Sequence, residues 1–345
     1  MIKPLRRLIS SAAFLVLTGL MIFAAKKWSA LVFAFYPKLS RKILAFLADL
    51  TAPIPVPVWE LAVCALAVWL IVSFVLALKR SRFLLWLTGV VEFVCGAAFV
   101  FVAIWGLNYF APPMQERLGF EVEQYTVQEL REAAEYYLAQ ANAAAQEVPR
   151  GADGVMLEED FADLAVHAGD GYQALAETMP CFDGSTARVK KLLSSKFMGA
   201  TGTTGIFIAF TGESSVSSTT FRSSLPFTMC HEIGHRMAFA RENEANFAAF
   251  LACSVSERAD FRYSGYYLAF VYCYNALYRV DRDAASALWA SACGEIKADA
   301  AASREHYERS KTKRSPRRPT GSTIPISRPS PWNPASSPTA RSSIC

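Results

Sequence analysis

The sequence predicts a mainly helical protein: three N-terminal transmembrane helices, a following α+β domain with a short edge strand, and a disordered tail. Of the 345 residues, 53% are hydrophobic and only 19% are charged, which is apolar for a soluble chain. Three runs within residues 1–110 carry almost no charge and are long enough to cross a bilayer. Residues 311–345 are instead rich in Pro, Ser and Arg and lack helical periodicity. We therefore expect a membrane domain over 1–110, a second domain over 111–310 and a tail over 311–345.

The three spans are expected at about residues 8–25, 61–78 and 88–110. A cleaved signal peptide is the alternative for the first run, but the two apolar runs that follow favour an uncleaved span. Glu92 interrupts the third run, and we expect it near the entry of that helix, where a carboxylate reaches the headgroups. Between the first two spans, Lys42–Leu50 could lie as an amphipathic helix in the interface.

The basic residues indicate an orientation with the N-terminus inside the cytoplasm. Lys79, Arg80 and Arg82 crowd the short turn after the second span, and such a turn is hard to translocate. The first loop argues the opposite way, because it also carries five basic residues, namely Lys26, Lys27, Lys38, Arg41 and Lys42. We favour the first arrangement, which places everything after residue 110 outside the cytoplasm.

Charge and cysteine content exclude two classes of protein. The formal net charge is +5, but residues 311–345 hold seven Lys/Arg and no acidic residue, so the rest of the chain is at −2. A nucleic-acid partner is therefore not expected. The eight Cys form no CxxC pair, which argues against a cysteine-based zinc module and favours buried thiols.

The second domain is expected to open with a helix from Thr126 to about residue 146, because Thr126 and Glu129 form a capping box. Helices are predicted at 158–178 and 187–197, followed by a strand at Ile206–Phe210. Glu213 lies in the turn after this strand, and we expect a solvated carboxylate there. Helices are then predicted from Pro226, through residue 244 to about 256, over 261–280 and in two further segments to about 309.

The segment 226–253 contains the candidate site. His231, Glu232 and His235 form an HExxH motif, and residues four apart share one face of a helix. Two imidazoles so placed can bind one Zn²⁺, with Glu232 beside them as a general base. A catalytic zinc site has three protein ligands and an open position, and Glu244 is the predicted third ligand.

Such a motif can also occur by chance on a surface helix, but its context here is unusual. The chain has only four His, and two of them are in the motif. Ser223 or Ser224 can cap the helix and Pro226 suits its first turn. The acidic stretch sits inside an apolar run, where an unpaired carboxylate would be costly to bury. Glu242 and Asn243 are expected to be exposed, and His167 and His306 are expected on solvated helical faces and not as metal ligands.

Two resemblances follow from these residues. The stretches HEIGH and ENEANFAA resemble the gluzincin metallopeptidases, and the Glu-Ala-Asn piece is similar to that of ImmA/IrrE-type peptidases, whose ligand Glu corresponds to Glu244. The whole layout resembles a bacterial membrane family of unknown function, number 3810 among such domains. The matching pieces are FTGE at 210–213, PFT at 226–228, RENEAN at 241–246 and FRYSGY at 261–266. The resemblance covers about residues 1–309 and is most specific around 205–270.

The resemblance implies a zincin-like peptidase domain in a multi-pass protein of the bacterial cell membrane, with Zn²⁺ as cofactor and a peptide or protein as substrate. A zinc-activated water would hydrolyse the peptide bond, with Glu232 as base and Tyr263, or less favourably Tyr266, as oxyanion donor. The strand at Ile206, Phe207 and Ile208 could pair with an extended substrate. Asn246 or Asp260 could orient a ligand histidine.

Two rival functions remain. A zincin fold could serve as a non-catalytic envelope protein for binding or scaffolding, although an intact Glu232 favours catalysis. Intramembrane proteolysis is disfavoured by the charges that crowd the motif, namely Arg222, Arg236, Arg241 and Glu242. In the tail, the family continues with helical sequence where this chain turns to Pro, Ser and Arg, which suggests a frameshift or truncation near Ser310.

Overall fold

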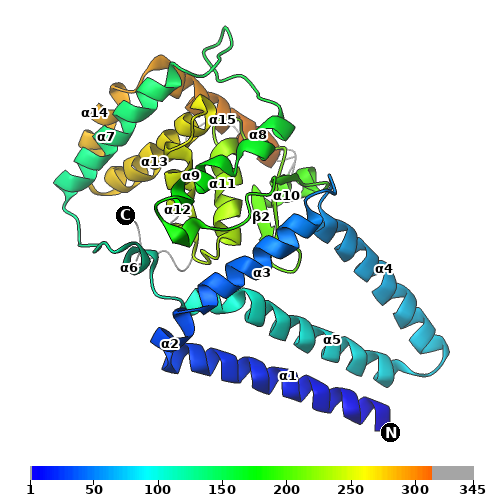
Figure 1. Ribbon diagram of the computed structural model, residues 1–345. Coiled ribbons are helices and arrows are strands. Elements are labelled where there is room, and N and C mark those ends of the chain that lie inside the picture. The colour runs from blue at the N-terminus through cyan, green and yellow to red at the C-terminus, as the bar shows by residue number, and fades with distance from the viewer. Residues whose placement is uncertain (1, 313–345) are drawn as a thin grey trace.

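The computed structural model describes residues 2–312 and is mainly helical (Figure 1). Three helices are long and apolar enough to cross a membrane, namely α1 (Ile2–Lys27), α4 (Val58–Lys79) and α5 (Phe83–Ile104). They extend away from the remaining helices, and α1 packs along α5 (Figure 1). Their outward side chains are largely exposed apolar residues, as expected of helices whose solvent is lipid.

The third of these helices is displaced from its predicted position. The prediction was 88–110, whereas α5 covers Phe83–Ile104 and a short helix, η1 (Gly106–Phe110), follows it. Glu92 therefore lies in the middle of α5 and not near its entry. Its carboxylate is 3.6 Å from Nε of Arg7 on α1, and the Arg7 guanidinium also donates to the Leu85 carbonyl. An ion pair between two helices, and not access to headgroups, accounts for this charge in an apolar segment.

Two helices, α2 (Ser29–Phe33) and α3 (Tyr36–Thr51), connect α1 to α4 along the base of the second domain (Figure 1). Polar side chains fasten α3 to the end of α5. The Ser40 hydroxyl donates to the Ile104 carbonyl at 2.7 Å, and the Asn108 amide donates to Ser40 Oγ at 3.0 Å. The α5 end of the membrane domain is thus hydrogen-bonded to the helix on which the second domain rests.

Helices build most of the second domain. The capping box of Thr126 and Glu129 is present and opens α7 (Val127–Ala145), which packs against the long α13 (Ala259–Val280). The remaining helices are α6 (Met114–Leu118), η2 (Pro180–Phe182), α10 (Ser195–Thr201), α11 (Leu225–Arg236), α12 (Glu242–Ser254), α14 (Arg282–Ala290) and α15 (Gly294–Thr312).

The predicted helix over 158–178 is two shorter helices, α8 (Phe161–His167) and α9 (Asp170–Ala176). Close packing requires glycine in the second of them. A Cβ atom on Gly171 would lie 2.0 Å from the carbonyl oxygen of Ala252, so only glycine lets α9 approach α12 so closely.

A small sheet completes the domain, with strand order β1-β3-β2. Strand β1 (Lys190–Lys191) is parallel to β3 (Glu213–Val216), and β2 (Gly205–Ile208) is antiparallel to β3. The predicted strand at 206–210 is therefore present in part and is an edge strand. The predicted helix over 187–197 is wrong for its first half, because the Lys190 ammonium is drawn into the sheet by a buried ion pair with Glu213.

Glu213 is also not the solvated turn carboxylate that the sequence suggested. It is only 2% exposed and accepts the backbone N–H groups of Val58 and Trp59 at 2.8 and 2.9 Å. Those N–H groups begin α4, where a negative charge is favoured by the helix dipole. Conversely, Glu60 of α4 accepts the backbone N–H groups of Leu193 and Ser194 in the second domain, at 2.7 and 3.0 Å.

Two predictions concern the end of the chain. Helix α15 continues to Thr312, so the helical character persists slightly beyond the predicted boundary at residue 310. The predicted disordered tail beyond that point, residues 313–345, lies outside the described residues.

Candidate metal centre

The HExxH motif lies on α11, and every residue of this helix is buried. Pro226 stands in the first turn, where its missing N–H costs nothing. Apolar side chains such as Phe227, Met229 and Ile233 fill the core around it. The helix packs against α12 on one side and against β2 and β3 on the other. Buried surroundings of this kind are not those of an accidental motif on a surface helix.

A tight reversal brings α12 back onto α11. Ala238 adopts φ +66, a left-handed conformation unusual for a residue with a Cβ atom. The backbone N–H of Phe239 then donates to the Gly234 carbonyl at 3.2 Å, and its own carbonyl turns toward His235. The reversal thereby places the first turn of α12 beside the two histidines.

Both imidazoles have their Nδ1 atoms occupied. Nδ1 of His231 contacts the Asn246 side-chain oxygen at 2.8 Å, and Nδ1 of His235 contacts the Phe239 carbonyl at 2.8 Å. Each partner atom is an acceptor, so each Nδ1 carries the proton and each Nε2 of a neutral ring presents a lone pair. From the sequence, Asn246 and Asp260 were both candidates to orient a ligand histidine, and the structure places Asn246 in this position.

The two Nε2 atoms converge on a carboxylate. His231 Nε2 is 3.2 Å from one Glu242 oxygen, and His235 Nε2 is 3.6 Å from the other. One ligand atom from each of these three residues lies within 4.8 Å of the other two. Without a metal, a proton on His231 Nε2 can bridge to Glu242 at this distance. When both rings are neutral, two Nε2 lone pairs and a carboxylate face one another, and this donor set fits a divalent metal.

Glu242, and not the predicted Glu244, is the carboxylate beside the histidines. Glu242 and Asn246 are four residues apart and share one face of α12, the face turned toward His231. Glu244 is two residues further on and is therefore rotated by roughly 200° around the helix. Its carboxylate instead accepts from Arg241 Nη1 at 2.7 Å and from the Met114 backbone at 3.1 Å. The free-energy cost of burying the Glu244 carboxylate is therefore offset by its ion pair with Arg241, and no metal is needed for this.

The electrostatics of the metal-free centre are dominated by burial. Burial lowers the pKa of His235 to about 4, and the charge of His231 adds to this effect. Burial also opposes protonation of His231, but the hydrogen bond to Glu242 and nearby acidic charges outweigh it and raise its pKa. The same hydrogen bond lowers the pKa of Glu242 to about 2. Glu242 thus stays ionised, as a metal ligand must be.

Glu232 is buried beside the two histidines, and one of its carboxylate oxygens has no hydrogen-bond partner. Its Oε2 is one of the few buried side-chain atoms in the described residues that have no hydrogen bond. Burial raises the pKa of Glu232 to about 8, with His231 opposing and Glu242 reinforcing the shift. A Cβ atom on Gly205, the first residue of β2, would lie 2.3 Å from Glu232 Oε1. The carboxylate therefore lies directly against the edge strand.

The end of α5 also reaches the centre. Trp105 Nε1 donates to the His235 carbonyl at 3.0 Å, and the two rings meet edge-on at 6.2 Å. Tyr109 packs edge-on against Trp105 at 5.3 Å. Burial, reinforced by the Glu242 charge, raises the pKa of Tyr109 and also that of Tyr272 on α13. The charge of Glu242 thus acts on both tyrosines, neither of which was a candidate in the sequence.

Tyr263, the predicted oxyanion donor, is not at the centre. Its ring is fully buried in the helical core and its hydroxyl donates to Asp299. Asp299 also binds the Arg150 guanidinium at 2.9 Å, so the tyrosine belongs to a buried ion-pair network that joins α13 to α15. The alternative, Tyr266, packs edge-on against Phe250 of α12 at 5.8 Å. The structure thus gives both residues packing roles.

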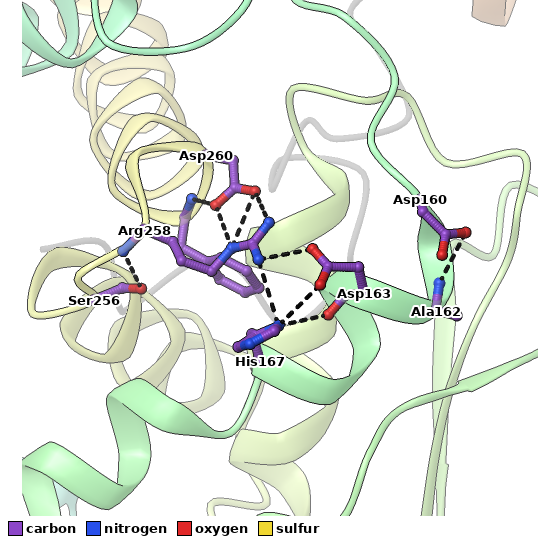
Figure 2. Close-up of polar contacts among 8 residues, drawn as sticks. Asp160, Ala162, Asp163, His167, Ser256, Arg258 and Asp260 are labelled. Carbon is purple, nitrogen blue, oxygen red and sulfur yellow. Dashed lines mark hydrogen bonds and ion pairs between the residues drawn. The ribbon is translucent and has the colours of Figure 1, made fainter.

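A second cluster of acidic and histidine side chains joins α8 to the start of α13 (Figure 2). Arg258 occupies its middle, 2.7 Å from an oxygen of Asp163 and 2.6 Å from one of Asp260. His167 Nδ1 lies 3.4 Å from the same guanidinium. Because a cationic side chain already fills the space between the acceptors, this cluster holds no metal. His306, the remaining histidine, contacts the Thr219 carbonyl at 2.7 Å and lies away from the centre on α15.

Fold and site together define a membrane-associated helical protein with a cluster of two buried histidines and one exposed carboxylate. Comparison with known families places it more closely. The model of a family described as "Protein of unknown function (DUF3810)" matches residues 35–318, and the chain belongs to this family. No curated protein and no solved structure matches the chain.

Proposed function

We propose that the protein is a membrane-anchored zinc metallopeptidase of the gluzincin-like type, with Zn²⁺ held by His231, His235 and Glu242. The observation that carries the proposal is the convergence of two Nε2 lone pairs and a carboxylate, next to a buried glutamate with an unpartnered oxygen. A structural zinc site needs no such glutamate. The resemblance of HEIGH and ENEANFAA to zincin sequences supports the same assignment.

Bound Zn²⁺ would supply Lewis acidity toward water and the substrate carbonyl. The chain's own groups do the rest. Glu232 accepts a proton from the attacking water and delivers it to the leaving amine, provided that the charge of the bound cation offsets the burial that raises the pKa of its carboxyl group. Asn246 and the Phe239 carbonyl hold the imidazoles in the required tautomer. The hydroxyl of Tyr272 or Tyr109 donates to the developing oxyanion, in place of Tyr263.

The substrate would bind along β2. This strand is at the edge of the sheet, so one side of its backbone is free to pair with an extended peptide. Ile206, Phe207 and Ile208 are half-buried, and Phe207 packs against Trp105 at 5.7 Å. Because Gly205 touches Glu232, a peptide paired with this strand would pass directly beside the general base.

We also propose that the centre lies outside the cytoplasm. The domain-side ends of the three apolar helices are Lys27, Val58 and Ile104, and the N-terminal end of α1 lies away from the domain (Figure 1). The basic turn at Lys79, Arg80 and Arg82 joins the opposite ends of α4 and α5. The positive-inside rule then favours the domain on the external face.

The test uses the full-length protein in detergent micelles, with Glu232→Gln compared against Glu257→Gln, an exposed glutamate outside the centre. Zinc content is measured by mass spectrometry and cleavage with a library of quenched fluorescent peptides. We expect both variants to bind zinc like the wild type, and Glu232→Gln alone to lose cleavage by about 100-fold or more. Undiminished cleavage by Glu232→Gln would refute catalysis by this centre. Zinc binding without cleavage in any form would favour the non-catalytic envelope protein.

A further inference from the structure

Helix α3 has three faces instead of the two of an ordinary surface helix. One face packs on the second domain and the end of α5, and includes Ser40, Leu44 and Ala48. A second carries the exposed charges Lys38 and Lys42. The third is apolar, and its residues are spaced at i, i+4, i+7 and i+11, namely Leu39, Ile43, Phe46 and Leu50.

The apolar face has little protein against it. The exposed fractions of Leu39, Phe46 and Leu50 are 47%, 67% and 65%. Single exposed apolar residues are common on protein surfaces, but a continuous row on one helix face marks an interaction site. Neighbouring α2 extends the row, because Leu31 is 69% exposed, and Phe35 just beyond α2 is 55% exposed.

The position of α3 shows which partner suits this face. The helix runs between the domain-side ends of α1 and α4, where the lipid-facing surface of the spans begins (Figure 1). Tryptophans stand at both of these ends, namely Trp28, which is 54% exposed and follows α1, and Trp59 in the first turn of α4. Such residues concentrate at the boundary between headgroups and acyl chains. An apolar face flanked by lysines is the pattern of a helix lying in that boundary.

We propose that Leu39, Ile43, Phe46 and Leu50 of α3 dock on the phospholipid bilayer, with Lys38 and Lys42 at the headgroups. This docking does not depend on the proposed peptidase activity. Docking would also fix the distance of the metal centre from the bilayer surface. The reason is that the turn between β2 and β3 rests on the face of α3 that is turned toward the domain. A Cβ atom on Gly212 would lie 2.6 Å from the Leu44 carbonyl oxygen, and Thr51 Oγ1 donates to the Thr211 carbonyl at 3.3 Å. One helix diameter, about 10 Å, therefore separates lipid from the domain at this point.

The experiment uses the wild-type, full-length protein in liposomes of phosphatidylcholine and phosphatidylglycerol that contain a phosphatidylcholine with a diazirine in its acyl chain. After illumination, mass spectrometry locates the lipid adducts. The spans provide the positive control, and the exposed Val127 and Tyr136 of α7 provide the negative control. We expect adducts on the α3 face at least 10-fold above those on α7. Adducts at the α7 level would overturn the proposal, and so would crosslinks between copies that exclude lipid from this face.

A matched pair of variants sharpens the result. Phe46→Glu places a charge on the apolar face, whereas Tyr136→Glu places one at a similarly exposed position on α7. We expect Phe46→Glu to reduce adducts on α3 several-fold while those on α1, α4 and α5 stay unchanged, and Tyr136→Glu to change neither. Equal labelling of α3 in both variants would contradict docking by this face. Unchanged labelling of the spans shows that each variant is still inserted.

Discussion

Exchanging the two neighbouring glutamates of α12 for glutamine tests the assignment of the metal ligand most directly. Glu242→Gln removes a carboxylate that faces both imidazoles, although its side chain is 78% exposed. Glu244→Gln removes a carboxylate that is 7% exposed and bound to Arg241 and Met114. The two substitutions are chemically identical and two residues apart, so each controls for the other.

The structure predicts opposite outcomes for the two variants. Removing groups that only orient a ligand lowers metal affinity by about 10–100-fold, so removing Glu242, the proposed ligand, should cost at least about 100-fold, or ~2.8 kcal/mol. Without metal, the variant also loses the hydrogen bond between Glu242 and His231, and because the Glu242 side chain is exposed this loss should cost no more than about 1 kcal/mol. Glu244→Gln breaks a buried ion pair and should cost about 1–3 kcal/mol of stability while zinc is retained.

Zinc affinity is measured by competition with a chelator of known affinity, and stability by thermal unfolding of the metal-free protein in the same detergent. For a domain of this size, the Glu244→Gln loss corresponds to a fall in Tm of roughly 2–12 °C. Full zinc binding by Glu242→Gln together with loss of zinc from Glu244→Gln would refute the assignment and restore the ligand first predicted from the sequence.

Three further predictions concern groups around the centre. Asn246→Ala should weaken zinc binding by about 10–100-fold, as measured by the same competition, because the His231 ring loses its orienting acceptor. Tyr272→Phe should lower kcat about 10-fold or more with zinc content unchanged, whereas Tyr136→Phe on α7 should have no effect; equal kcat in both would remove Tyr272 from the mechanism. Gly171→Ala should destabilise the domain by more than 1 kcal/mol in thermal unfolding, because its Cβ would overlap the Ala252 carbonyl. An unchanged Tm there would show that α9 can shift away from α12.

The features predicted well from the sequence depend on residues close together in the chain. The three apolar runs, the capping box at Thr126 and the HExxH helix are patterns of hydrophobicity or spacing that need no distant partner. Where these predictions were wrong, the error was in the position of a helix end. For α5, the run of apolar residues continued beyond the helix into η1. Apolar composition alone does not show where such a helix ends.

The features predicted poorly depend on contacts between distant segments. The Lys190–Glu213 pair draws a stretch predicted as helix into the sheet, and no local pattern reveals it. The identity of the carboxylate beside the two histidines was within reach of sequence reasoning. Asn246 was already considered as a partner of a ligand histidine, and Glu242 is the acidic residue one helical turn before it. Family similarity to a Glu-Ala-Asn motif outweighed that simple geometric rule.

Helix α4 and the second domain each accept backbone hydrogen bonds from the other through a buried glutamate. These contacts bear on whether the second domain can be released from the membrane. Glu213 of the domain neutralises the first turn of α4, and Glu60 of α4 holds the backbone before α10. A fragment cut off before residue 111 would leave Glu213 with Lys190 alone and would strand the amides of Leu193 and Ser194. Helix α4 is thus a structural part of the second domain, so proteolysis between the two would release an unstable fragment and not a folded domain.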